Sequence, residues 1–389
     1  MTTIYHYLRD FSPESPRFNT GMEKAVSGLA AEIAAIDPSA HSTVLCEGPK
    51  AVDIQRPEGF RVICFDNTSV AKQRFSLAPA LRRFVEEEIQ DSLVVLNAIF
   101  HSGVWLFSHE LRRMSVPFIV APHDPYHPAI FEGNRLKKEI YWRLFERPML
   151  RGAAAVQVLD RRHQQYLIAR GVNTPYIEVV NGYVPEEVPD ESRLEWRSDG
   201  PIKILFLGRI DRINKGVDLL VEAFTQISRS NSQVHLTVQG PDHGDAAMIR
   251  QQVAQAGLSD RIDVFPPDYK TIPTELAARF DLFVLPSRFE GFGLSALEAM
   301  LAGRPIIISE IAGLAPHVQK CDGGVVVEAS VESIKAGIEQ LIARRSEWRE
   351  IGMRGRKYVL ENLNWSRIAQ DALVEYRKIL NGQMVEQTP

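Results

Sequence analysis

The chain has 389 residues, of which 45% are hydrophobic and 24% are charged, and its formal net charge is −4. These values are typical of a soluble globular protein with two domains, and they argue against general nucleic-acid binding, which requires a basic surface. The three cysteines are far apart in the sequence, which argues against a disulfide framework.

Short apolar runs alternate with helical patterns along the first half of the chain. Helical spacing of apolar residues begins at Gly21 and recurs over residues 77–89. Strands alternating with helices predict a parallel, doubly wound α/β sheet. The runs that we predict to be strands are 4–8, 44–46, 61–65, 92–97, 116–121, 153–159 and 177–182.

Two positions in this half lie where a predicted strand leads into a loop. Gly21 lies at a strand–loop–helix junction, where a glycine lets a backbone N–H approach a phosphate, although glycine also serves any tight turn. His123 and Asp124 begin a proline-rich loop directly after the strand at 116–121. A loop histidine is usually a solvated or hydrogen-bonded bystander, but ligands bind at the carboxyl ends of parallel strands. Both interpretations therefore stay open.

The segment 134–151 is basic and amphipathic. It carries six cations and two anions, with leucine, isoleucine and aromatic residues interleaved. One interpretation is a helix that packs its apolar side on the sheet and leaves its basic side in solvent. The other is a face that contacts anionic lipid at the inner surface of a membrane. We favour the first.

Composition changes after residue 183, where residues 184–192 are acidic and proline-rich, as is typical of a linker. A second sheet is predicted to begin at 202–207. Its first loop contains Arg209 and Lys215 between a buried strand and an amphipathic helix, a suitable place to hold a diphosphate. Basic residues in a surface turn are the alternative. The loop is neither a Walker loop nor a dinucleotide fingerprint.

The most informative stretch is 280–305, which predicts a buried strand at 282–285, a glycine-bearing loop and a helix from Leu294. Glu298 falls on the apolar stripe of that helix, where a buried carboxylate requires a partner, either inside the protein or on a ligand. Glu290 lies in the preceding loop. The residues between them include Gly291, Phe292 and Gly293, and glycines allow a ligand to approach the backbone closely.

Seven residues separate the two glutamates, Gly-Phe-Gly-Leu lies between them, and Glu-Ala-Met begins at the second. This pattern resembles the donor-binding signature of the retaining glycosyltransferases of family 4. The resemblance implies the GT-B fold, α/β with two Rossmann-like domains facing across a cleft. The implied domains are an acceptor-binding domain at 1–183, a linker at 184–200, a nucleotide-sugar-binding domain at 201–363, and a helix at 364–383 that returns to the first domain.

Two positions depart from the family pattern. Many members have two adjacent glycines where this chain has Thr20-Gly21, and Pro316-His317 stands where Pro-Glu is more common. These differences affect the expected contacts with phosphate and sugar.

The resemblance also implies an activity: transfer of a hexose from a nucleotide-diphosphate sugar to a glycan or lipid-linked acceptor. UDP-sugars such as UDP-glucose are favoured as donors, with GDP-mannose as an alternative. No metal or other cofactor is expected, because the chain has no Asp-x-Asp motif. A nucleotide-sugar epimerase of the same fold and a non-catalytic glycan-binding protein are the alternatives.

The resemblance assigns a role to each candidate residue. Arg209 and Lys215 are expected at the diphosphate, Glu290 at the sugar hydroxyls and Glu298 at the ribose. His123 is expected at the sugar from the first domain. The backbone near Gly21 and at Gly291, Phe292, Gly293 and Leu294 is expected to contribute N–H groups.

The expected location is the cytoplasm. The N-terminal residues lack the apolar core of a secretory signal, and no apolar run approaches the roughly 18 residues of a membrane span. Contact with the membrane surface through 134–151 is compatible with that location.

Overall fold

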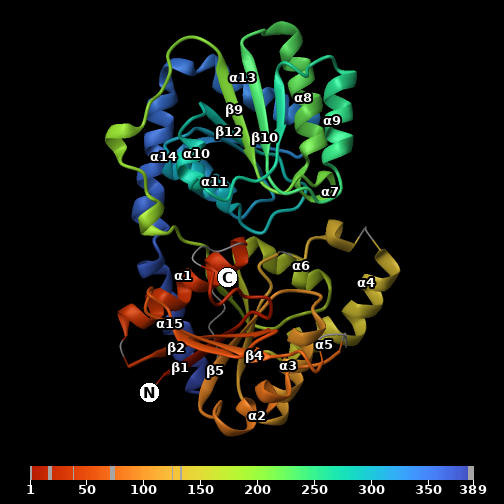
Figure 1. Ribbon diagram of the computed structural model, residues 1–389, viewed down its shortest axis with the longest axis vertical. Coiled ribbons are helices and arrows are strands. Elements are labelled where there is room, and N and C mark those ends of the chain that lie inside the picture. The colour runs from red at the N-terminus through yellow and green to blue at the C-terminus, as the bar shows by residue number, and fades with distance from the viewer. Residues whose placement is uncertain are drawn as a thin grey trace. The chain divides into compact units, whose positions relative to one another are not determined.

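The computed structural model describes residues 2–15, 20–37, 39–70, 75–124, 126–131 and 134–383. The chain forms two compact units, drawn in Figure 1. Unit 1 consists of Met1–Gly182 together with Trp365–Pro389, and unit 2 is Tyr183–Asn364. Unit 1 is therefore discontinuous in sequence.

Residues 184–200, expected to form a separate linker, instead belong to unit 2. They contain two short 3₁₀ helices, η4 (Pro185–Glu187) and η5 (Glu191–Arg193). Nη1 of the buried Arg304 donates to the carbonyl of Glu195 at 2.7 Å, and the indole of Trp196 donates to the carbonyl of Gly303 at 2.8 Å. Proline-rich composition signals irregular backbone, and here that irregular backbone supplies one acceptor to a buried guanidinium.

Within the described residues, unit 1 contains a sheet of eight strands in the order β3-β4-β2-β1-β5-β6-β7-β8. All neighbouring pairs are parallel except β3 with β4, which is antiparallel. The strands are β1 (Thr3–Tyr7), β2 (His41–Gly48), β3 (Val52–Gln55), β4 (Arg61–Asp66), β5 (Ser92–Asn97), β6 (Phe118–Ala121), β7 (Ala155–Val158) and β8 (Tyr176–Glu178).

The antiparallel edge strand β3 is an addition to the predicted parallel sheet, whose other neighbouring strands all pair in parallel. Its four residues alternate between exposed and half-buried, so its sequence lacks the continuous apolar run of the buried strands. The last predicted strand of this half also ends earlier than expected, at Glu178 rather than at 182.

Helices cover both faces of the sheet in unit 1. They are α1 (Gly21–Ile36), α2 (Pro79–Glu87), α3 (Ser102–Arg113), α4 (Arg135–Tyr141), the π-helix η2 (Trp142–Glu146), α5 (Arg147–Gly152), α6 (Gln164–Ala169) and α15 (Trp365–Leu380), with 3₁₀ turns η1 (Pro128–Phe131) and η3 (Arg161–His163). The arrangement gives an apolar core on each side of the sheet.

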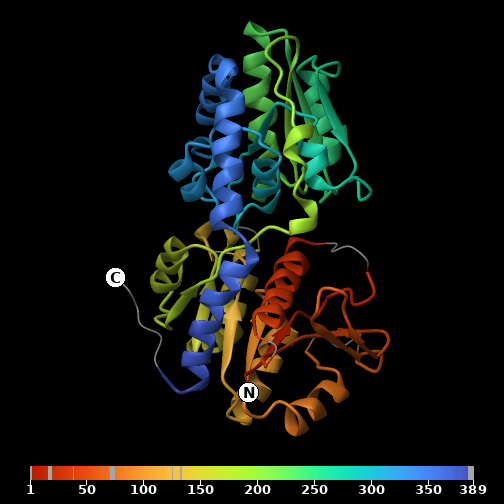
Figure 2. The ribbon, with the colours of Figure 1, turned by 90° about the vertical axis from the view of Figure 1, so that its left-hand side faces the viewer.

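The last helix, α15, packs beside α1 in the core of unit 1 (Figure 2). A Cβ at Gly28 of α1 would lie 2.3 Å from the indole nitrogen of Trp365, so only glycine lets the two helices approach this closely. The hydroxyl of the buried Tyr376 donates to Gln157 at 2.6 Å.

Unit 2, all of whose residues are described, contains a parallel sheet of six strands in the order β11-β10-β9-β12-β13-β14. Numbered from its own first strand, this is the order 3-2-1-4-5-6 of the doubly wound nucleotide-binding fold. The strands are β9 (Ile202–Leu207), β10 (Val234–Gln239), β11 (Ile262–Phe265), β12 (Leu282–Leu285), β13 (Ile306–Ser309) and β14 (Gly324–Val327).

The helices of unit 2 lie on both faces of this sheet. They are α7 (Arg212–Lys215), α8 (Val217–Ser230), α9 (Ala246–Gln255), α10 (Pro273–Ala277), α11 (Leu294–Leu301), α12 (Ala315–Cys321), α13 (Val331–Ala343) and α14 (Trp348–Asn362), with the 3₁₀ turn η6 (Arg345–Glu347). The predicted strand at 282–285 and the predicted helix start at Leu294 are confirmed.

Candidate functional site

The strand order of unit 2 reverses between β9 and β12, and open α/β sheets bind ligands beyond the carboxyl ends of the strands at such a switch point. The loop 208–216 follows β9, and the loop 286–293 follows β12. These are the two loops that the sequence singled out. The topology therefore brings them to one edge of the sheet.

The two loops are in direct contact. The backbone N–H of Phe289 donates to the carbonyl of Asn214 at 3.0 Å. Gly216 has φ +64, and a Cβ there would lie 2.3 Å from the carbonyl oxygen of Pro286. Glycine is thus required at residue 216 both for its left-handed backbone and for the close approach of the second loop.

Lys215 and Glu290 form an ion pair across the two loops. Lys215 Nζ lies 2.5 Å from Glu290 Oε2, and the side chains are only 13% and 11% exposed. The hydroxyl of the buried Ser287 donates to the same carboxylate oxygen at 3.1 Å. The sequence placed these residues at the same site, but it did not predict that they bind each other.

Arg209 lies at the end of β9 and is exposed. Its charge acts on Asp211, whose pKa lies below its ordinary value. Burial alone would raise that pKa, but hydrogen bonds from Asn214 and the charge of Arg209 lower it. Arg209 and Lys215 thus place two cations near the carboxyl end of one strand.

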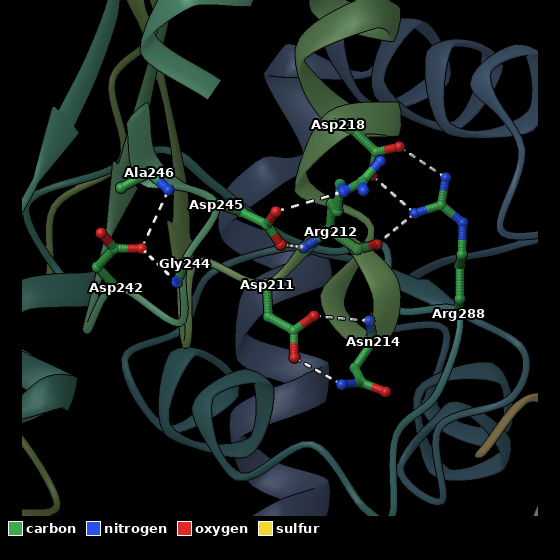
Figure 3. A network of polar contacts seen from close by, with 9 residues as sticks. All are labelled: Asp211, Arg212, Asn214, Asp218, Asp242, Gly244, Asp245, Ala246 and Arg288. Atoms are coloured by element: carbon green, nitrogen blue, oxygen red, sulfur yellow. Dashed lines mark hydrogen bonds and ion pairs between the residues drawn. The ribbon is translucent and has the colours of Figure 1, made fainter. Parts of the chain in front are cut away.

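A polar network holds the first loop in shape (Figure 3). Asp211 caps α7 and accepts hydrogen bonds from the backbone N–H of Asn214 at 3.0 Å and from its side chain at 2.6 Å. Asp245, from the loop before α9, accepts the backbone N–H of Arg212 at 2.9 Å. These carboxylates satisfy N–H groups that the short helix α7 leaves without partners.

Arg288 joins the second loop to the same network (Figure 3). Its guanidinium binds both oxygens of Asp218, at 2.7 and 2.8 Å, and donates to the carbonyl of Arg212. These contacts tie Arg288, two residues before Glu290, to backbone and side-chain groups on both sides of Lys215 in the chain. Sequence reasoning missed Arg288, because nothing along the chain indicates that its partner lies 70 residues away.

The helix α11 begins where the predicted glycine loop ends. Gly293 has φ +105, and a Cβ there would lie 3.0 Å from the side chain of Leu285. Gly291 and Phe292 are buried, Leu294 is half-buried, and Glu298 is 8% exposed. The prediction that Glu298 lies on the core-facing side of the helix is therefore confirmed. Its contact with a ribose stays a prediction.

In unit 1 the strand order reverses between β1 and β5, which defines a second switch point. His123 lies beyond the carboxyl end of the neighbouring strand β6 and is half-buried. Its Nε2 lies 2.7 Å from Asn97 Oδ1, at the end of β5. Burial lowers the pKa of His123 to about 4, so the imidazole is neutral near pH 7. The structure therefore gives His123 a hydrogen-bond partner, which leaves a role toward a ligand open.

Gly21 is the exposed first residue of α1. Thr20 and Glu23 form a capping box around it: Thr20 accepts the N–H of Glu23 at 3.1 Å, and Glu23 accepts the N–H of Thr20 at 3.0 Å. Part of the hydrogen-bonding capacity of this helix end is thus used within the protein.

The basic segment 134–151 only partly fits the interpretation that we favoured. Trp142 is buried and Phe145 packs edge-on against Trp105. Three apolar residues instead face solvent, with exposed fractions that a helix packed by its apolar side would not show: Leu136 (74%), Ile140 (49%) and Leu144 (60%).

No helix in the described part of the chain is long and apolar enough to cross a membrane. Among the same residues, no three histidine, cysteine, aspartate or glutamate side chains gather in a group that could hold a metal ion.

Solved structures of glycosyltransferases share this architecture. Sucrose-phosphate synthase from Thermosynechococcus elongatus superposes with a TM-score of 0.77 at 21% identity, covering 98% of this chain and 100% of the other. Anabaena HepE, solved with UDP and glucose, superposes with a TM-score of 0.70 at 18% identity, covering 96% and 99%. The two-unit α/β architecture is thus the GT-B fold.

Sequence similarity gives the family. Residues 190–358 match the model of the glycosyl transferases group 1, and residues 20–182 match that of the glycosyl transferase 4-like domain. The D-inositol 3-phosphate glycosyltransferase of Segniliparus rotundus is 30% identical over 183 residues, which are 46% of this chain and 40% of that protein. The match thus spans less than half of that relative. The chain belongs to the GT-B glycosyltransferases of family 4.

Proposed function

We propose that this protein transfers a hexose from a nucleotide-diphosphate sugar to a glycan or lipid-linked acceptor, with retention at the anomeric carbon and without a metal ion. The observation that carries the proposal is the Lys215–Glu290 pair at the switch point of unit 2, where the loop after β9 also carries Arg209. Cations there offset the negative charge that builds on the departing diphosphate, usually the largest contribution to such catalysis. The adjacent carboxylate accepts hydrogen bonds from sugar hydroxyls.

The remaining site residues take complementary roles in this proposal. The backbone N–H groups from Gly291 to Leu294, at the start of α11, bind sugar and phosphate oxygens. The buried Glu298 binds the ribose hydroxyls. The proposal also assigns a sugar contact to His123 and a phosphate contact to the backbone near Gly21.

UDP-glucose is the favoured donor, supported by the UDP and glucose bound to Anabaena HepE, which shares the fold. GDP-mannose is the donor to test against it. Titration calorimetry with UDP, UDP-glucose, GDP and GDP-mannose measures the preference directly. Tighter binding of the guanine nucleotides would contradict the choice of base. If none of the four bound, the donor site itself would be misplaced.

The alternatives differ in the products that they form. An epimerase of the same fold releases a new sugar from the donor when no acceptor is present, whereas the proposed transferase does not. A non-catalytic binding protein converts no donor under any condition. Product analysis with and without glycan acceptors separates the three, and the anomeric coupling constant of the product reports whether configuration is retained.

The acceptor side of the proposal includes contact with the inner face of a membrane. It is supported by the apolar stripe of Leu136, Ile140 and Leu144, which recurs every four residues along α4 and η2 and is exposed. Exposed cations flank this stripe: Arg135, Lys137 and Arg143. An apolar stripe bordered by cations suits an anionic lipid surface.

Vesicle flotation tests this contact. The protein is expected to float with vesicles that contain phosphatidylglycerol and to remain unbound with pure phosphatidylcholine. Replacing Leu136, Ile140 and Leu144 together with serine should abolish flotation. Serine at Ile168 and Val374, which are also about half exposed, should not. Equal flotation of both variants would place the contact elsewhere.

A further inference from the structure

Asn97 links three neighbouring strands at the switch point of unit 1. It is the last residue of β5 and is 2% exposed. Its Nδ2 donates to the carbonyl of Tyr7 in β1 at 3.1 Å and to that of Val95 at 3.2 Å. Because a carbonyl only accepts, the amide has one orientation, and its Oδ1 faces His123 Nε2 at 2.7 Å.

This orientation determines the tautomer of His123. An amide oxygen cannot donate, so Nε2 must carry the hydrogen in the bond to Asn97. The imidazole is neutral near pH 7, because burial lowers its pKa to about 4. Nδ1 is then an unprotonated acceptor, and it has no hydrogen-bond partner among the described residues.

A second buried histidine, His6, is also neutral near pH 7 and disfavours protonation of His123. His6 lies in β1, is 1% exposed, and has a pKa lowered to about 4, mainly by burial and then by the charge that His123 would carry. A proton on either ring therefore disfavours a proton on the other. The two imidazoles stay neutral together.

The backbone around His123 is strained. Eight non-glycine residues in the described part of the chain have positive φ, and four lie in the loops after β5 and β6: Ala98 (+113), Phe100 (+51), His123 (+58) and Tyr126 (+30). Such conformations each cost about 1–3 kcal/mol and persist where the surroundings hold them, commonly at functional sites. The Asn97–His123 hydrogen bond is one of the contacts that hold these loops.

We propose that Asn97 is a positioning residue, which fixes the orientation and tautomer of His123 so that Nδ1 accepts a hydrogen bond from a hydroxyl of the bound sugar. The role of the sugar rests on the function proposed above, whereas the tautomer rests only on the contacts of Asn97. The two parts can therefore fail separately.

The tautomer is tested by a long-range ¹H–¹⁵N spectrum of protein labelled at histidine, with His123→Gln and His6→Gln used to assign the signals. The wild type is expected to show His123 with the hydrogen on Nε2 at pH 7. A hydrogen on Nδ1, or a doubly protonated ring, would overturn the proposal. This test needs neither substrate nor a variant at residue 97.

The positioning role is tested with Asn97→Asp, which keeps an acceptor beside His123 Nε2, adds a negative charge and removes the Nδ2 donor to the carbonyls of Tyr7 and Val95. A carboxylate beside the ring raises a histidine pKa by about 1–3 units, so Nδ1 gains a proton at higher pH. We expect the acid limb of the kcat profile to move upward by the same 1–3 units, so that the loss of kcat is at most about twofold at pH 7 and grows as the pH falls, with KM little changed.

Asn181→Asp is the matched control, because it makes the same substitution at another buried amide of unit 1 that is not among the residues lining the cavity beside His123. It should leave the tautomer of His123 unchanged. Asn97→Ser is the second variant should Asn97→Asp not fold. It should allow a mixture of tautomers and lower kcat.

If either variant at Asn97 alters the spectrum but leaves kcat and its pH profile unchanged, Asn97 does not position His123 for the reaction. If the wild type transfers no sugar at all, the proposed function fails while the spectrum still decides the tautomer.

Discussion

The switch points of the two units hold their candidate site residues in different ways. In unit 2 the side chains form ion pairs. In unit 1 they form a hydrogen bond between a buried asparagine and a histidine in a strained loop. Lys215 binds Glu290 and Arg288 binds Asp218 in the first case. In the second, Asn97 binds His123. A ligand that carries charge can exchange partners with an ion pair, while a neutral, pre-set imidazole is suited to neutral hydroxyls.

The largest effect is expected from breaking the ion pair. Lys215→Ala should lower turnover by about 10²–10³-fold, because it removes a charge that stabilises the departing diphosphate. Steady-state kinetics measure the loss, and calorimetry with the nucleoside diphosphate should show weaker binding. Full turnover would remove Lys215 from the site.

Glu290→Gln changes the other residue of the same ion pair. It releases Lys215 from its carboxylate, so affinity for the nucleoside diphosphate should be kept or increased while turnover falls. Because the two residues bind each other, the double variant should lose less than the sum of the single variants. Additive losses would mean that the pair does not act as a unit.

In unit 1, the expected effect is on stability and depends on pH. The carboxyl of Glu146 is buried and accepts from the hydroxyl of Tyr126 at 2.6 Å and from the N–H of Phe100 at 3.0 Å. Burial raises its pKa to about 7, although these two hydrogen bonds act in the opposite direction. The folded state thus binds more protons than the unfolded state between about pH 4.5 and 7.

The free energy of unfolding therefore falls as pH rises through that window, by about 3 kcal/mol in total, and levels off above it. Glu146→Gln cannot titrate, so its stability relative to wild type should rise by about that amount from pH 4 to pH 8. Urea unfolding at both pH values measures this change. A constant difference between the two proteins would contradict the raised pKa.

A smaller effect is expected where the two loops of unit 2 meet. Gly216→Ala should destabilise the protein by at least about 2 kcal/mol, because the methyl group meets the carbonyl of Pro286 as well as a left-handed backbone. Gly257→Ala is the matched control, since Gly257 has φ +70 but no atom within 4 Å of its added Cβ. It should cost only about 1 kcal/mol. Equal costs would show that the loops separate freely.

No effect is expected from removing metal ions. If Arg209 and Lys215 supply the positive charge, transfer should survive excess chelator unchanged. Loss of activity that Mg²⁺ or Mn²⁺ restores would assign part of that charge to a metal.

The two switch points also differ in how far the sequence predicts them. The loop after β12 and the helix α11 were predicted because one contiguous stretch contains the strand, the glycines and both glutamates. The Lys215–Glu290 pair joins residues 75 apart, so the sequence indicated the residues of the site but not their contact.

In unit 1 the sequence predicted His123 at the end of a strand, but not its partner. Asn97 appeared only as the last residue of an apolar strand, and the positive φ at His123 has no signature in its neighbours. The edge strand β3 was missed because its side chains are half exposed and carry no apolar run. Contacts between strands distant in sequence are set by packing, which no local pattern records.

The position of α15 has a consequence for synthesis of the chain. The core of unit 1 includes Trp365 and Tyr376, which a ribosome adds only after all of unit 2 has been made. Until α15 has been made, the apolar surface that α1 and the neighbouring strands bury against it remains exposed. Unit 2 is continuous and can fold on emergence, so the N-terminal unit is expected to be the last to reach its native state.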